Sequence, residues 1–209
     1  AAISIFFRYS QYQDLDDTSI DMIKSEESGV YPFIISFGEY NTKDDIFTFR
    51  ANEAEHEYQF IREYVGKNDD KEIPFTLTKT FKFKNDYIIE FEIFLESHDR
   101  AYLPLNNDEI MYTLTYGPQI GPGGENVDKR DVFPKYIYFY NDKRKDVTNK
   151  LKKNNIYAID KDASWIAIEG KYFAVIIDPL SDFHKEDMGF DTQTIKGLSS
   201  TSSMFFNRD

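Results

Sequence analysis

With 209 residues, the chain is long enough to bury a substantial core, and an all-β sandwich of this size can form a single domain. Its net charge of -12 repels phosphate backbones and anionic headgroups on average, which disfavours binding to nucleic acids and to membrane surfaces. The absence of cysteine excludes disulfides and thiolate metal sites, and an aromatic content of 17% favours pleated sheet over helix.

Short strands are predicted after an acidic connection that runs to Gly29. Strand-forming residues favour strands over 31–37 and 46–50, and the first of these ends at Gly38. The next segment, 51–65, is ambiguous, because its apolar residues have roughly helical spacing while its centre also suits a strand.

The most regular alternation in the chain lies between Phe75 and Leu95. Large apolar residues alternate with Thr, Lys and Glu on both sides of a turn at 84–86. This pattern predicts a hairpin with one solvated face. A further strand is predicted over 111–116, before a loop rich in glycine and proline.

The second half of the chain begins with tyrosines that alternate with Ile and Phe over 136–140, which predicts a strand. The basic segment 143–153 has room for one short helix. The densest apolar signal covers 165–168 and 172–177 around a tight turn, and it predicts a second hairpin whose return strand is buried on both faces. After Pro179 the pattern weakens, and no closing strand is predicted.

No catalytic, cofactor-binding or metal site is predicted. The nucleophile elbow, the P-loop, the dinucleotide fingerprint and the paired histidines of zinc proteases are all missing from the sequence. The tyrosines Tyr136, Tyr138 and Tyr140 are the candidates for a binding surface if the face that carries them is exposed. Trp165 and Tyr172 lie in apolar hairpin strands, where a packing role is favoured.

Two segments resemble YidC-type membrane protein insertases. The segment from Ala163 to Pro179 resembles the family's stretch in which a Trp-Ile-Ala run leads to a Tyr-Phe strand and a proline. The residues that carry this resemblance are Trp165, Tyr172, Phe173 and Pro179. Upstream, the residues from Thr78 to Phe83 and the following Asp86-Tyr87 resemble the same family's Thr-Lys-Thr-Phe hairpin. These are packing motifs, so they indicate a fold and carry no catalytic residue.

The resemblance implies a large twisted antiparallel β-sandwich, a galactose mutarotase-like supersandwich with one or two short helices. It implies that residues 1–209 form one periplasmic domain, a fragment of a longer protein of the bacterial inner membrane. That protein would act with the Sec translocon and with nascent membrane proteins, supporting their insertion and folding as a chaperone does. The domain itself is expected to need no cofactor and to be no enzyme.

Two alternatives remain open from the sequence. The first is a mutarotase-like domain that binds or epimerises sugars, since one fold can host unrelated functions. It would need two histidines and a glutamate in a cleft, for which the candidates are His98, His184, Glu96 and Glu169. The second is a free extracytoplasmic binding protein or lipoprotein.

Overall fold

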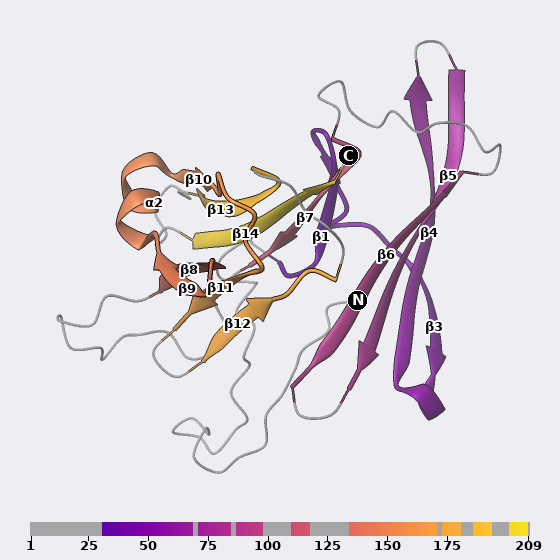
Figure 1. Cartoon of the computed structure of the whole chain (residues 1–209). Helices are drawn as coiled ribbons and strands as arrows, with labels where there is room; N and C mark the ends of the chain where they lie inside the picture. Colours follow the sequence, from indigo (N-terminus) through magenta and orange to yellow (C-terminus); the bar gives the residue numbers. More distant parts are fainter. Residues whose placement is uncertain are drawn as a thin grey trace, which may run out of the picture. The chain divides into compact units, whose positions relative to one another are not determined.

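The structure is a computed structural model that describes residues 31–68, 71–84, 87–97, 110–117, 134–170, 173–180, 186–193 and 201–208 (Figure 1). The acidic connection expected before Gly29 lies outside these residues. The described residues form antiparallel sheets with one 3-10 turn and one α-helix, which confirms the all-β class. They divide into two compact units, 37–112 and 31–36 together with 113–208.

The first unit contains a four-stranded antiparallel sheet in the order β3-β4-β5-β6. Its elements are β2 (Tyr40–Asn41), β3 (Thr48–Asn52), the 3-10 turn η2 (Glu53–Glu55), β4 (Glu57–Asn68), β5 (Lys71–Phe83) and β6 (Ile89–Ser97). The predicted hairpin is confirmed as β5 and β6. The ambiguous segment 51–65 becomes mainly strand, because β4 pairs with β5 along its whole length.

The two faces of this sheet differ in chemistry. Cross-strand pairs such as Tyr58 with Phe81 and Tyr64 with Phe75 place aromatic residues on one face, while Thr and Glu residues alternate with them on the other. Along β5 every second residue from Ile73 to Phe81 is buried. The apolar alternation therefore sets which face of the hairpin is covered.

The second unit is a sandwich of two antiparallel sheets. One contains β10-β13-β14-β7-β1 and the other β12-β11-β8-β9. The strands are β1 (Ile34–Phe37), β7 (Tyr112–Tyr116), β8 (Lys135–Tyr140), β9 (Lys143–Asp146), β10 (Ile156–Ala158), β11 (Trp165–Glu169), β12 (Ala174–Ile177), β13 (Met188–Gln193) and β14 (Thr201–Arg208), and the helix α2 is Thr148–Asn154. Buried residues of both sheets, among them Tyr136, Ile166, Phe190 and Met204, form one shared core.

Two findings in the second unit differ from the sequence prediction. The return strand of the second hairpin, β12, is not buried on both faces, because it lies at an edge of its sheet; the central residues of β11 are buried instead. After Pro179 the chain forms β13 and β14, which the sequence pattern does not reveal. Within the described residues, no helix has the length and apolarity needed to cross a bilayer.

Candidate functional site

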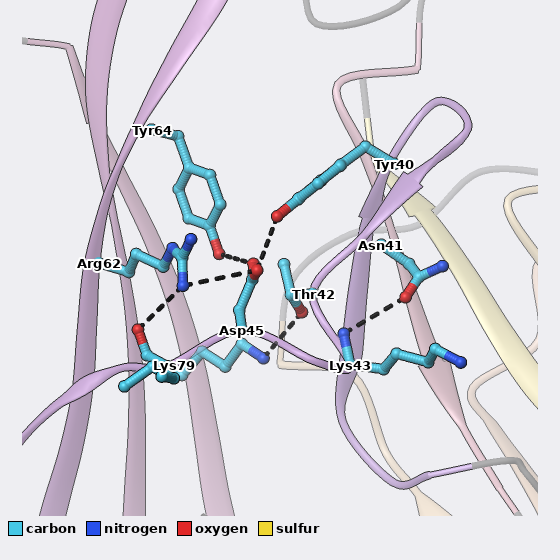
Figure 2. Close-up of polar contacts among 9 residues, drawn as sticks. Tyr40, Asn41, Thr42, Lys43, Asp45, Arg62, Tyr64 and Lys79 are labelled. Carbon is cyan, nitrogen blue, oxygen red and sulfur yellow. Dashed lines mark hydrogen bonds and ion pairs between the residues drawn. The ribbon is translucent and has the colours of Figure 1, made fainter.

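The densest polar contacts surround Asp45, in the segment between β2 and β3 (Figure 2). Its carboxylate accepts hydrogen bonds from the hydroxyls of Tyr40 at 2.6 Å and Tyr64 at 2.5 Å. Arg62 Nη1 lies 3.5 Å from the same carboxylate and also donates to the carbonyl oxygen of Ile46 at 3.0 Å. Three side chains from β2 and β4 thus converge on one carboxylate.

Lys79 of β5 reaches the same segment from the covered face of the sheet. The side chain is only 7% exposed, and its Nζ donates to Thr42 Oγ1 at 3.2 Å. The ammonium also lies 4.7 Å from the centre of the Phe47 ring, a cation–π contact. Burial lowers the pKa of Lys79 to about 8, an effect that the negative charge of Asp45 partly opposes.

The tyrosines of this group keep their protons. The pKa of Tyr64 lies well above its ordinary value. Burial is the largest cause, and the hydrogen bond to Asp45 is the second largest. The pKa of Tyr40 is raised mainly by its hydrogen bond to Asp45. We call these residues, with Arg62 and Lys79, the Asp45 cluster. Its donors reach acceptors within residues 42–47, most of them the Asp45 carboxylate, so its evident chemistry is to fasten this segment to the sheet.

The three tyrosines proposed as a binding surface occupy core-facing positions of β8. Tyr136 and Tyr138 are 5% and 7% exposed and belong to the sandwich core, while Tyr140 is half-buried against it. The exposure on which that hypothesis depended is therefore absent at Tyr136 and Tyr138. Burial raises the pKa of Tyr138, and the neighbouring Tyr157 and Asp160 add to the effect.

The residues of the family motif pack the second hairpin. Trp165 stacks on Phe139 of the neighbouring strand, with ring centres 5.2 Å apart and planes 9° from parallel. The carbonyl of Phe173 accepts a 2.7 Å hydrogen bond from Gly170 N–H and closes the turn. Pro179 is half-buried just after β12, and Tyr172 lies outside the described residues.

Of the residues considered for a sugar site, the structure describes only the two glutamates. Glu96 is exposed on β6, and Glu169 forms an ion pair with Arg144. His98 and His184 lie outside the described residues. In the part of the chain that the structure describes, no three His, Cys, Asp or Glu side chains are placed to hold a metal ion.

The edge of the β12 sheet offers a second candidate site. In an antiparallel pair, residues that are hydrogen-bonded across the strands alternate with residues whose backbone groups point outward. Because Gly170 and Phe173 are hydrogen-bonded, Ala174 and Ile176 direct their backbone N–H and C=O groups away from β11. In the described strands β12 is the outermost of this sheet, and Ile176 is 59% exposed. The opposite edge, β9, has the charged sequence Lys-Arg-Lys-Asp, a common protection against strand addition. β12 has no such protection.

The comparison with known proteins finds a similarity to a membrane protein insertase. Membrane protein insertase YidC of Treponema denticola is 29% identical to this chain over 169 residues. The predicted relation to YidC-type insertases is confirmed. The match covers 80% of this chain and 28% of the relative, so the chain spans less than a third of that YidC. No family model matches the chain, and no solved structure matches it significantly.

The Asp45 cluster was not predicted from the sequence, although the position of one lysine indicates it. Lys79 falls in phase with Phe75, Leu77, Phe81 and Phe83 on the covered face of β5. A lysine at an apolar position of a strand indicates a buried partner.

Proposed function

We propose that this chain is a non-catalytic periplasmic domain of a membrane protein insertase in the bacterial inner membrane. It would support the insertion and folding of membrane proteins by contacting nascent chains or Sec translocon components. The observation that carries this proposal is the match to YidC over 80% of the chain. The packing of Trp165, which carries part of the resemblance to the family, supports it, because a packed aromatic residue specifies a scaffold.

The contact site that we propose is the outer edge of β12. An extended polypeptide can add to an open strand edge through backbone hydrogen bonds, which suits substrates of many different sequences. Ala174 and Ile176 supply the outward backbone groups, and the exposed Ile176 side chain supplies an apolar contact. The mutarotase-like alternative has no comparable support, since a relative that matches most of this chain is an insertase.

Site-specific photocrosslinking in the parent protein tests this function. A photoreactive residue at Ile176 should capture nascent membrane proteins or Sec components during their synthesis. Val65 is a matched control, because its exposure of 60% equals that of Ile176 within a percentage point and it lies on β4. Equal capture at both positions would refute the β12 site. Full insertion activity after deletion of residues 31–208 would refute the supporting role as a whole.

A further inference from the structure

One region of the chain is strongly basic, although the net charge of the whole chain is negative. Residues 135–161 contain eight lysines and arginines but only three aspartates, in a chain whose net charge is -12. The structure places most of these cations on β9 and α2, which follow each other directly in the second unit. We call residues 143–153 the basic segment.

The basic segment presents its charges to solvent. All four residues of β9 are exposed, and α2 buries only Thr148 and Leu151, so its lysines project away from the core. The last turn of α2 carries Lys152 and Lys153, where positive charge is favoured by the helix dipole. The fold therefore stabilises the basic segment without neutralising it.

Some cations of this region are already engaged. Arg144 pairs with Glu169, and Lys150 lies 5.3 Å from the centre of the Tyr157 ring. Among the described residues, Lys143, Lys145, Lys152 and Lys153 have no ion-pair partner. Four unneutralised ammonium groups within eleven residues form a local field opposite in sign to that of the whole chain.

An exposed apolar side chain follows these lysines closely in the sequence. Ile156 follows the end of α2 almost directly and is 57% exposed. Lysines with long apolar stems beside an exposed aliphatic residue suit the boundary between headgroups and acyl chains. An inorganic phosphate or an acidic peptide would use the charges and leave Ile156 in water.

We propose that the basic segment docks this domain onto the anionic phospholipid headgroups of a bilayer. The occupant follows from charge complementarity, from Ile156, and from the relation to a membrane protein insertase. The inference goes beyond the proposed function, because lipid docking orients the domain whether or not the β12 edge binds a substrate.

Vesicle co-sedimentation of the 209-residue chain tests the proposal. Phosphatidylcholine vesicles with phosphatidylglycerol should bind the protein, pure phosphatidylcholine should not, and salt should weaken binding. The variant K145Q/K152Q/K153Q should bind roughly 100-fold more weakly, since each lysine near an anionic surface contributes about fivefold. The control K43Q/K82Q/K84Q changes the net charge equally and should bind like wild type, because those lysines lie in the first unit.

Several results would overturn the proposal. Binding that ignores phosphatidylglycerol, or that falls equally in both triple variants, would show that the basic segment does not dock on lipid. Competition by inorganic phosphate would identify a simple anion site, and tighter binding to polyglutamate than to vesicles would identify an acidic protein partner. Urea unfolding of both variants guards against misfolding. An exposed lysine should change stability by no more than about 0.5 kcal/mol, and the surface ion pairs of Lys82 by no more than about 1 kcal/mol. The photocrosslinking result at Ile176 is independent of all these outcomes.

Discussion

The substitution Lys79→Met tests how a buried ammonium affects stability. Lys79 has a pKa of about 8 in the folded chain and an ordinary value of 10.5, so its proton is held less tightly after folding. At about 1.4 kcal/mol per pKa unit, keeping the buried amine protonated costs on the order of 3 kcal/mol. This cost is fully present below pH 8 and is relieved as the pH rises toward 10.5.

The direction of this pH effect follows from the number of protons that the folded and unfolded states bind. Between the folded and unfolded pKa values the unfolded state binds more protons, so the free energy of unfolding rises with pH. From pH 7 to about pH 9.5 the gain from Lys79 is about 2 kcal/mol. The raised pKa of Tyr64 acts oppositely above its ordinary value of 10.0, so this window avoids most of that effect.

Urea unfolding of wild type and K79M across this pH range measures the gain directly. The wild type should become more stable by about 2 kcal/mol, whereas K79M should change by less than about 0.5 kcal/mol. Both proteins share every other titrating group, so their difference isolates Lys79. Parallel pH profiles for the two proteins would refute the burial of a charged lysine beneath residues 42–47.

Two further substitutions probe each unit separately. Asp45→Asn removes the acceptor of the Asp45 cluster and should cost about 2 kcal/mol in urea unfolding, while Asp44→Asn, whose side chain is 86% exposed, should change stability by less than about 0.5 kcal/mol. Equal effects at both positions would contradict the cluster geometry. Gly189→Ala should cost about 2 kcal/mol or more, since its Cβ would collide with the Tyr157 carbonyl oxygen and lie 2.6 Å from Phe205 Cζ. Adding Phe205→Leu should not restore stability, because the backbone collision remains; full recovery would locate the strain in the ring alone.

The hairpins were predictable because their information is local. Between Phe75 and Leu95, apolar residues at every second position and a polar turn specify both the strands and the covered face. The same holds for the turn between β11 and β12. In both cases, residues within about twenty positions decide the structure.

β13 and β14 pair with each other locally, with Met188 opposite Phe206, yet they were not predicted because polar and small residues interrupt their apolar pattern. Ser202 and Ser203 are buried, although serine is usually exposed and only the three apolar residues that follow them suggest a covered strand. The hydroxyls of Thr192 and Ser202 lie 3.1 Å apart across the strand pair, which satisfies polar groups that the sequence pattern suggests are solvated. Polarity alone therefore misassigns such a strand.

The tyrosines of β8 show a related limit. Alternation along 136–140 correctly separates the tyrosines from Ile137 and Phe139, but it does not say which set faces the sandwich core. Only the opposing sheet, with Phe190 and Met204, decides that the tyrosines point into the core. The Asp45 cluster is harder still to predict, since Thr42 and Lys79 are 37 positions apart.

The packed aromatic residues that relate this chain to YidC therefore identify a scaffold, and partner contacts must depend on other groups. Trp165 and Phe139 stack within the sheet, so they are not free to select a partner. The β12 edge and the basic segment have the opposite character. Ile176 of β12 is exposed, and four lysines of the basic segment have no ion-pair partner among the described residues. The net charge of -12 predicts that the whole chain is repelled by anionic surfaces. Salt, however, screens electrostatic interactions beyond about 10 Å. The lysines nearest to an anionic surface therefore decide whether that part of the chain is attracted to it.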